Sequence, residues 1–246
     1  MRLYGLIGYP LGHSFSARFF AEKFSSEQID DCAYRNFPIP DINQLPRLLH
    51  DHPDLRGFNV TIPYKELIRP YLYEIDPEAD AIGAVNCVRI HDGRLQGYNT
   101  DVYGFRASLL NLLGPARPDA LVLGTGGASK AVRFVLDGLG IRHQTISRTA
   151  GTGKIAYTEL TPEIAAAHPL IINTTPLGTF PDTGGCPALP YAALTPSHFL
   201  FDLVYNPPLT EFLRRGQAQG AAIMNGYDML VGQAIRSWEI WQETGR

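Results

Sequence analysis

The chain has 246 residues, 45% of them hydrophobic, so it is long enough to bury one or two cores. Its 21 basic and 24 acidic residues give a net charge of −3 without a block of like charge, which argues against nucleic acid or an anionic membrane surface as a partner. Three scattered cysteines form no CxxC pair, so no cysteine metal or redox site is expected, and the cytoplasm is the expected compartment. No apolar run approaches the roughly 18 residues of a membrane span.

The first hundred residues alternate between predicted strands and predicted helices, which is typical of a mainly parallel sheet. The strands are expected at 2–8, 33–37 and 57–62, and the helices after residue 16, over 42–49 and near Tyr64. Asp92 and Gly93 lie between two further strand-like runs, 86–90 and 94–98. Because an Asp-Gly pair in such a place is a strong hairpin signal, an antiparallel hairpin is expected at the edge of the first sheet.

Residues 119–149 predict a strand, a glycine-rich turn, a helix and a second strand, which is how a dinucleotide-binding unit begins. Gly124 allows a tight turn, and Gly126 lets the backbone approach a pyrophosphate that the N–H groups of the next helix would bind. Ser129 replaces the third glycine of the usual pattern, and a residue of this size still permits close helix packing. The alternative is an ordinary glycine turn between a strand and a helix.

The residues after the second strand favour NADP over NAD. An NAD site would have an acidic residue about 20 positions after the turn, where it accepts hydrogen bonds from the ribose. Here Ser147, Arg148 and Thr149 follow the strand, with Lys154 nearby. A cation suits a 2′-phosphate, although a solvated surface arginine is the alternative.

The pattern predicts an α/β fold with two domains. A helix is expected from Asp101 until Gly114 and Pro115 break it, and later runs complete a set of five or six parallel strands. Further helices are expected near 163–167 and over 210–219, further strands at 170–173, 199–203 and 221–224, and a long loop over 176–190. A final amphipathic helix from about Tyr227 is expected to pack on the first lobe. The expected domains are a substrate-binding domain, 1–101 with the helix 226–246, and a Rossmann-like dinucleotide-binding domain, 102–225.

Polar residues in the first lobe are the candidates for substrate chemistry. Ser14 and Ser16 stand two apart after a strand, although Ser16 alone could be a helix cap. Thr61 is expected to end a buried strand, and Lys65 follows four residues later, where a surface lysine is equally compatible with the composition. Asp101 lies near the exit of the hairpin and could instead cap the helix that it begins.

The chain resembles the shikimate dehydrogenase family in seven blocks that occur in that family's order. The blocks are HSFS (13–16), NVTIPYK (59–65), GAVN (83–86), NTD (99–101), GTGGAS (124–129), DLVYNPPLT (202–210) and GYDMLVGQA (226–234). The resemblance implies reversible, NADP-dependent reduction of 3-dehydroshikimate to shikimate, a step toward chorismate and the aromatic amino acids, without a metal. It also implies a substrate lobe built from the N-terminal part and the last helix.

The resemblance implies a role for particular residues. Lys65 and Asp101 would be the catalytic pair at the substrate, because a lysine held by a carboxylate can stabilise and protonate the oxygen of a ketone during hydride transfer. The other substrate contacts would be Ser14 and Ser16 for the carboxylate, and Thr61, Asn86, Tyr205 and Gln233 for the hydroxyl and carbonyl groups. The cofactor contacts would be Gly124, Gly126, Gly127, Ala128 and Ser129 at the pyrophosphate, Ser147, Arg148 and Thr149 at the 2′-phosphate, and Leu203 and Gly226 at the nicotinamide.

Three positions depart from the family's usual pattern: Ala17 replaces Pro, Cys87 replaces Thr and Ser147 replaces Asn. Two other functions stay open, a quinate/shikimate dehydrogenase that uses NAD and a non-catalytic dinucleotide-sensing module. Apart from the resemblance, the glycine turn alone also permits a folate or amino-acid dehydrogenase. The expected partners are small molecules, and the expected state is a monomer or a homodimer.

Overall fold

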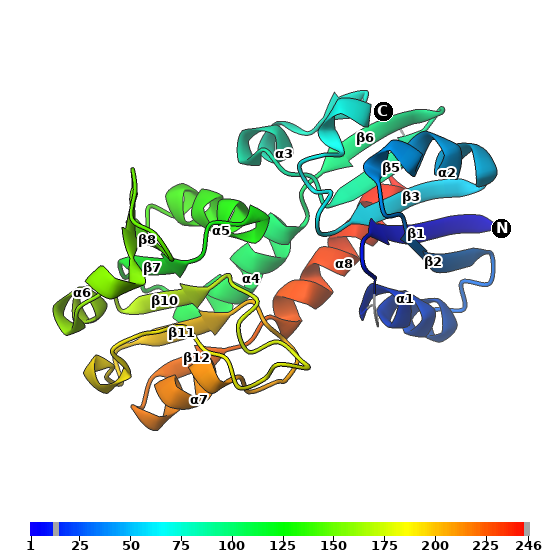
Figure 1. Ribbon diagram of the computed structural model, residues 1–246. Helices are drawn as coiled ribbons and strands as arrows, with labels where there is room; N and C mark the ends of the chain where they lie inside the picture. Colours follow the sequence, from blue (N-terminus) through cyan, green and yellow to red (C-terminus); the bar gives the residue numbers. More distant parts are fainter. Residues whose placement is uncertain (12–14, 244–246) are drawn as a thin grey trace. The chain divides into compact units, whose positions relative to one another are not determined.

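The computed structural model describes residues 1–11 and 15–243 and divides into two compact units. The first unit comprises Met1–Thr100 and Gln233–Arg246, and the second comprises Asp101–Gly232. Helix α8 (Tyr227–Gln242) begins in the second unit and ends in the first. Each unit is an α/β sheet structure (Figure 1), so the predicted fold class is confirmed.

The first unit contains a six-stranded mixed sheet in the order β2-β1-β3-β5-β6-β4. Its strands are β1 (Arg2–Gly8), β2 (Cys32–Pro38), β3 (Leu55–Val60), β4 (Glu74–Ile75), β5 (Cys87–His91) and β6 (Arg94–Tyr98). Strand β1 pairs parallel with β2 and β3, whereas β5 and β6 form the expected antiparallel hairpin. Its turn has φ angles of 49° at Asp92 and 73° at Gly93, the left-handed values that a two-residue hairpin turn requires.

Two apolar layers cover the faces of this sheet. Helices α2 (Leu45–Asp51) and α3 (Pro77–Ile82) contribute to a core with Leu3, Ile7 and Phe58, while the opposite layer joins α1 (Phe15–Ser26) and α8 around Tyr4. The alternation along β1 explains this, because Leu3 and Ile7 face one side and Tyr4 faces the other. In the second layer, Trp241 stacks on Tyr4 at 4.9 Å and donates a hydrogen bond to the Val88 carbonyl at 3.0 Å.

Several predicted boundaries in the first unit are wrong. No helix begins near Tyr64: one hydrogen bond joins Ile68 to the Tyr64 carbonyl, and the chain then enters a 3-10 turn, η2 (Arg69–Tyr71), that contains Pro70. Strand β3 ends at Val60, so Thr61 follows the strand instead of ending it. The hairpin is not the edge of the sheet, because β4 pairs outside β6. A further 3-10 turn, η1 (Ile42–Gln44), precedes α2.

The second unit contains six parallel strands in the order β12-β11-β10-β7-β8-β9. The strands are β7 (Ala120–Leu123), β8 (His143–Ser147), β9 (Lys154–Ala156), β10 (Leu170–Asn173), β11 (Phe199–Asp202) and β12 (Ala222–Met224). In sequence order this is the 3-2-1-4-5-6 arrangement of a doubly wound dinucleotide-binding fold. The order reverses between β7 and β10, and the carboxyl ends of these strands are where such folds bind ligands.

Helices cover both faces of this second sheet (Figure 1). They are α4 (Asp101–Leu113), α5 (Gly127–Gly138), α6 (Pro162–Ala167) and α7 (Glu211–Ala218), with 3-10 turns η3 (Tyr157–Glu159) and η4 (Tyr191–Ala193). Leu121, Ile171 and Leu200 form one core with Phe212 of α7, and Phe105 of α4 packs edge-on against Phe201 at 5.1 Å. Strand β11 therefore has apolar side chains on both faces, as expected for a parallel sheet.

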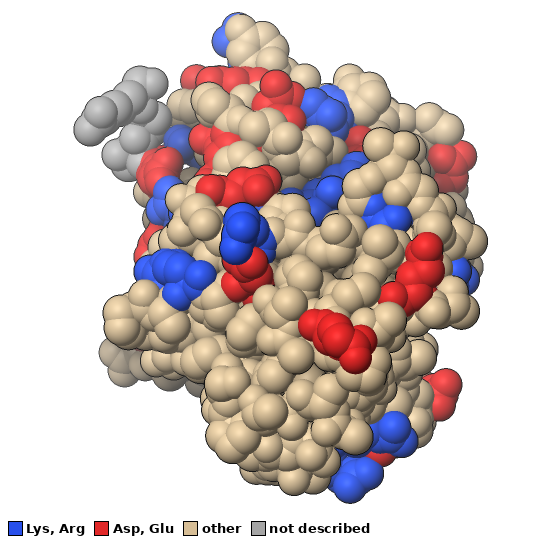
Figure 2. All heavy atoms as spheres, turned by 90° about the vertical axis from the view of Figure 1, so that its left-hand side faces the viewer, with Lys and Arg blue, Asp and Glu red and all other residues tan. Residues whose placement is uncertain are grey.

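Charged side chains of both signs are interspersed on the face of the molecule drawn in Figure 2, without a field of one sign. No helix within residues 1–11 and 15–243 is long and apolar enough to cross a membrane.

Candidate active site

Three segments of the first unit meet at the carboxyl ends of β1 and β3. Thr61 donates its backbone N–H to the Ile7 carbonyl at 2.9 Å, and a Cβ on Gly8 would overlap the Thr61 methyl group. The Lys65 carbonyl accepts a hydrogen bond from Val85 at 2.7 Å, which fixes the segment before β5 beside the lysine. Thr61, Lys65 and Asn86 are thereby brought to one edge of the sheet, where the sequence predicts a substrate site.

A buried network of neutral side chains, here called the first polar cluster, supports this edge. Its members are Tyr34, Asn59, Asn86, Thr100, Gln233 and Ser237. Both ends of the Asn86 amide contact Thr100, since Nδ2 donates to Thr100 Oγ1 at 3.0 Å and Oδ1 accepts from the Thr100 N–H at 2.6 Å. Thr100 Oγ1 in turn lies 3.5 Å from Gln233 Oε1, so two predicted substrate ligands share one hydroxyl.

Asn59 connects the cluster to α8 and β2. Its Nδ2 donates to Ser237 Oγ at 2.9 Å, and its Oδ1 accepts from the Tyr34 hydroxyl at the same distance. Burial raises the pKa of Tyr34, and a hydrogen bond with Ser16 opposes the increase, so Ser16 contacts this cluster too. Ser16 is a buried residue of the first turn of α1 and not its cap, because the helix begins at Phe15. Ser14 lies outside the described residues.

The second unit contains the other predicted substrate residues. Asp101 is the first residue of α4 and is 8% exposed, and Tyr205 lies in the loop that follows β11. Lys65 belongs to the first unit and is partly exposed.

The glycine turn of the second unit has the geometry that a pyrophosphate requires. Gly124 has a φ of 111°, which strongly favours glycine, and Gly126 is the N-cap of α5 without a side-chain cap. A Cβ on Gly126 or Gly127 would meet nothing within 4 Å, so the space above the first turn of α5 is open. The N–H groups of Gly127, Ala128 and Ser129 begin the helix there, where an anion is stabilised by the helix dipole.

Ser129 has a structural role in this turn. Its side chain is fully buried, and its hydroxyl donates to the Gly124 carbonyl at 2.9 Å. Ser129 therefore closes the turn from inside, which explains how it replaces a glycine. The hydroxyl is directed to the backbone, so the phosphate contact expected of Ser129 can come from its N–H group.

The turn after β8 is formed by Ser147. Its hydroxyl donates to the Thr149 carbonyl and accepts from the Thr149 N–H at 3.2 Å. Ser147 is buried and is the last residue of β8, whereas Arg148 and Thr149 are exposed. No side chain in the described part of the chain forms an ion pair with Arg148, so its guanidinium can bind an anion at this end of the sheet. The sequence predicted that this strand ends at Ile146, whereas the strand includes Ser147.

Leu203 and Gly226 pack against each other at the ends of β11 and β12. Gly226 donates its N–H to the Val204 carbonyl at 3.1 Å, and a Cβ on Gly226 would overlap the Leu203 carbonyl oxygen. Only glycine therefore fits beside Leu203. Beneath this contact lies the second polar cluster, Asn173, Thr175, Asp202 and Thr210.

Sequence reasoning assigned no role to most members of the two clusters. Asn59, Asp202 and Thr210 lay within the quoted blocks, and Asn173 directly follows an apolar run, so polar residues at the ends of apolar strands were the available signal. Tyr34 and Ser237 gave no such signal.

Within residues 1–11 and 15–243, no group of three or more His, Cys, Asp or Glu side chains could hold a metal ion.

Comparison with known proteins identifies the family. The model of the shikimate dehydrogenase substrate binding domain matches residues 6–88. A shikimate dehydrogenase (NADP(+)) of Carboxydothermus hydrogenoformans is 37% identical over 259 residues, which cover 98% of this chain and 91% of that protein. The chain belongs to the shikimate dehydrogenase family. The match spans both units of the molecule.

Solved structures of the shikimate dehydrogenase fold superpose over nearly the whole chain. Shikimate 5-dehydrogenase from Thermus thermophilus, in complex with NADP(H) and shikimate, has a TM-score of 0.86 with 33% identity and covers 98% of this chain and 94% of its own. Quinate dehydrogenase from Corynebacterium glutamicum, in complex with NAD, has a TM-score of 0.87 with 28% identity and covers 98% and 93%. The two-domain fold of the family is thus present here, and its members differ in cofactor and substrate.

Proposed function

We propose that this chain is an NADP-dependent dehydrogenase that interconverts 3-dehydroshikimate and shikimate. The observation that carries this proposal is the relationship to shikimate dehydrogenases (NADP(+)) over 98% of the chain. The first unit, with the end of α8, would bind the substrate, and the second unit would bind the cofactor.

The first polar cluster suits a substrate with several hydroxyl groups. Buried amides and hydroxyls present fixed donors and acceptors, which distinguish a hydroxylated ring from an apolar one. Thr61, Asn86 and Gln233 would contact the hydroxyl and carbonyl groups, together with Tyr205 of the second unit. Ser14 and Ser16 would bind the carboxylate.

Lys65 and Asp101 would carry out the proton chemistry. NADPH, when bound, supplies the hydride that reduces the ketone. Lys65 Nζ would hold the carbonyl oxygen, stabilise the negative charge that develops on it, and donate the proton that completes the hydroxyl group. Asp101 would accept a hydrogen bond from the ammonium group and keep it charged. In the reverse direction Lys65 would accept the proton from the hydroxyl.

The second unit would bind NADP through three groups of residues. The turn at Gly124, Gly126 and Gly127 and the N–H groups of Ala128 and Ser129 would take the pyrophosphate. Arg148 and Thr149, in the turn that Ser147 closes, would take the 2′-phosphate, for which an exposed guanidinium is well suited. Leu203 and Gly226 would contact the nicotinamide.

The test is a steady-state assay in which shikimate and quinate are each combined with NADP and NAD. The proposal requires the highest kcat/KM for shikimate with NADP. The likeness to an NAD-bound quinate dehydrogenase makes quinate oxidation with NAD the second candidate, and a higher kcat/KM for that pair would replace the proposal. The cytoplasm stays the predicted compartment, consistent with cysteines that form no disulfide in the described part of the chain, and a monomer or homodimer stays the predicted state.

A further inference from the structure

Asp202 is a fully buried carboxylate at the carboxyl end of β11. Its Oδ1 accepts hydrogen bonds from Asn173 Nδ2 at 2.9 Å and from the Val204 N–H at 3.0 Å, and its Oδ2 accepts from the Thr210 hydroxyl at 2.5 Å. No lysine or arginine in the described ranges forms an ion pair with it. Three neutral donors therefore hold a charge that a protein would ordinarily place at its surface.

Stability alone does not account for this carboxylate. Burial raises the pKa of Asp202 to about 6, and the hydrogen bonds from Thr210, Val204 and Asn173 offset only part of that increase. At neutral pH the group is ionised at a cost to folding, since its pKa lies above the ordinary value of 3.8. An uncharged side chain of the same shape would avoid this cost, so the acceptor capacity of the carboxylate needs another explanation.

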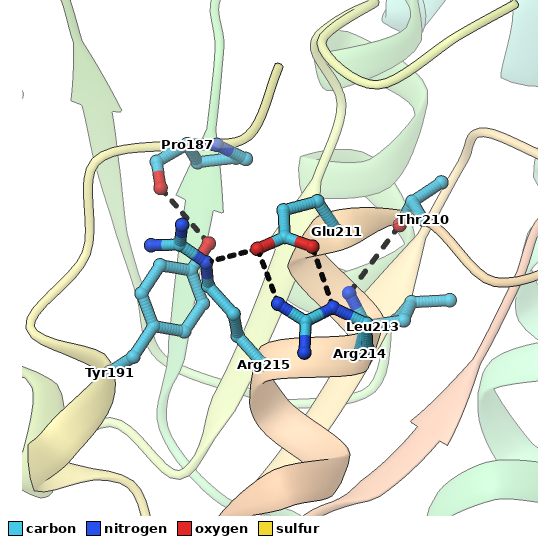
Figure 3. Close-up of polar contacts among 7 residues, drawn as sticks. All are labelled: Pro187, Tyr191, Thr210, Glu211, Leu213, Arg214 and Arg215. Carbon is cyan, nitrogen blue, oxygen red and sulfur yellow. Dashed lines mark hydrogen bonds and ion pairs between the residues drawn. The ribbon is translucent and has the colours of Figure 1, made fainter. Parts of the chain in front are cut away.

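The three donors come from three separate segments at one edge of the sheet. Asn173 ends β10, and its Oδ1 accepts from the N–H and hydroxyl of Thr175 at 3.0 and 2.6 Å. Val204 belongs to the loop after β11. Thr210 caps α7 by accepting from the Leu213 N–H at 3.4 Å (Figure 3).

The start of α7 is itself fixed. Glu211 accepts from Arg214 at 2.7 Å and from Arg215 at 2.6 Å, and the Arg215 guanidinium lies over the Tyr191 ring at 5.2 Å (Figure 3). The Tyr191 hydroxyl donates to the Pro187 carbonyl at 2.9 Å, which ties the long loop to the same helix (Figure 3). Thr210 is therefore a fixed partner for Asp202.

The backbone that Asp202 holds is the one expected at the nicotinamide. Leu203 directly follows it and donates to the Asn173 carbonyl at 3.0 Å, while Val204 donates to the carboxylate and accepts from Gly226. The chain at the end of β10 also connects this backbone to the glycine turn. Thr174 Oγ1 donates a hydrogen bond to the Leu123 carbonyl at 2.6 Å, and a Cβ on Gly124 would lie 2.7 Å from Thr174 Oγ1.

We propose that Asp202 is a positioning residue for the nicotinamide end of the cofactor: through Val204, Asn173 and Thr210 it holds the Leu203 backbone against Gly226, while the adenosine end is bound independently of it. The inference rests on the proposed function, since it requires a dinucleotide at this edge. Asp202 contacts the ends of β10 and β11, whereas the predicted 2′-phosphate site follows β8. Its loss should therefore affect one end of the cofactor only.

The experiment compares two ligands by calorimetric titration of the full chain: NADP, and adenosine 2′,5′-bisphosphate, which lacks the nicotinamide. Asp202→Ala leaves three buried donors without an acceptor, so the Kd for NADP should rise roughly ten- to a hundred-fold while that for the bisphosphate changes less than about two-fold. Asp202→Asn keeps Oδ1 for Asn173 and Val204 and should recover most of the NADP affinity. The KM for shikimate should stay near the wild-type value in both variants.

A matched control is Asp119→Ala. Asp119 directly precedes β7, at the amino end of the strand instead of the carboxyl end, and it forms an ion pair with Arg142 on the surface. This substitution should change neither Kd. If Asp202→Ala does not fold, Thr210→Val carries the test, with the same rise in the Kd for NADP expected and Thr210→Ser expected to restore binding. Equal losses for both ligands, or wild-type NADP binding in Asp202→Ala or Thr210→Val, would overturn the inference. A wild-type chain that binds neither ligand would overturn the proposed function itself, so the two failures are distinguishable.

Discussion

The two polar clusters lie at corresponding edges of two sheets, but they differ in chemistry. The first consists of amides and hydroxyls, such as Asn59, Asn86 and Thr100, and its one ionisable member, Tyr34, has a pKa that burial raises. The second contains the buried carboxylate of Asp202. The edge proposed for the substrate is built from neutral side chains and keeps its hydrogen bonds over a wide pH range, whereas the edge proposed for the cofactor contains one titratable carboxylate.

Under the proposed function, this difference follows from what each edge would bind. Hydroxyl and carbonyl groups of a small substrate are recognised by side chains, which must be buried and fully hydrogen-bonded to stay in place. A dinucleotide would be bound largely by backbone N–H groups at Gly126 and the start of α5, so the side chains around this turn would have to fix the backbone. The predictions that follow test this separation, from the largest effect to the smallest.

The strongest test of the substrate side is Lys65→Ala. If Lys65 donates the proton, kcat should fall by roughly 10² to 10⁴, while the Kd for NADP changes little. Asp101→Asn should cost less because it keeps a hydrogen-bonding shape. Stopped-flow and steady-state kinetics would measure both, and the double variant should be scarcely slower than Lys65→Ala, since the two residues serve one step. Losses that multiply would show that they act independently.

The corresponding test of the cofactor side is Arg148→Ala. Loss of a charge-assisted contact of about 1.5 to 3 kcal/mol should weaken NADP binding roughly ten- to a hundred-fold and leave NAD and the KM for shikimate nearly unchanged. Fluorescence titration with both cofactors would measure this, and Arg142→Ala, an exposed arginine directly before β8, is the control. An equal loss for NAD and NADP would contradict the assignment of Arg148 to the 2′-phosphate.

A buried charge in the second cluster predicts a pH dependence of stability. The pKa of Asp202 is raised to about 6 from 3.8, so its contribution to stability is complete below about pH 4 and is lost as the pH rises through 6. Asp202→Asn should therefore be more stable than the wild type by about 2 to 3 kcal/mol at pH 8, and the two should converge near pH 4. Urea unfolding at both pH values would measure the difference.

Other titrating groups contribute equally to the wild type and to Asp202→Asn, so they cancel in the difference between the two free energies of unfolding. The pKa of Glu211 is lowered to about 2 by hydrogen bonds from Arg214 and Arg215, so its contribution is lost as the pH falls below about 4.5, in the opposite direction. It is present in both proteins and cancels. A difference that does not change with pH would mean that Asp202 is not an isolated buried charge.

The first cluster should respond to mutation without such a pH dependence. Asn59→Leu removes the Oδ1 acceptor of the Tyr34 hydroxyl and the Nδ2 donor to Ser237 Oγ, and it should lower the free energy of unfolding by about 1 to 2 kcal/mol, equally at pH 5 and pH 8. Tyr34→Phe in the same protein should recover part of the loss, because it removes the hydroxyl group that has lost its Asn59 acceptor. If the stability lost in Asn59→Leu varied with pH, the two clusters would not differ in their pH dependence as proposed.

Much of the fold could be predicted because its signals are local. The hairpin was predicted from Asp92 and Gly93, whose positive φ angles the turn requires, and β7, β10 and α4 coincide with their apolar runs. The strands β4 and β9 have two and three residues, too few to show a period, and were missed. The short α3 was missed despite Asp76 as its cap and Gly83 at its end, which are ordinary helix signals.

The sequence by itself determined which residues could hold a cofactor, because a glycine turn between an apolar strand and a helix binds phosphate through its own backbone. Only the tertiary structure decided what holds those residues in place. Asn59 contacts Ser237, 178 positions away in the sequence, and Asp202 contacts Asn173, 29 positions away. No periodic pattern or turn motif in the sequence predicts either pair. Such partners are chosen by strand order and register, which depend on the packing of the whole sheet.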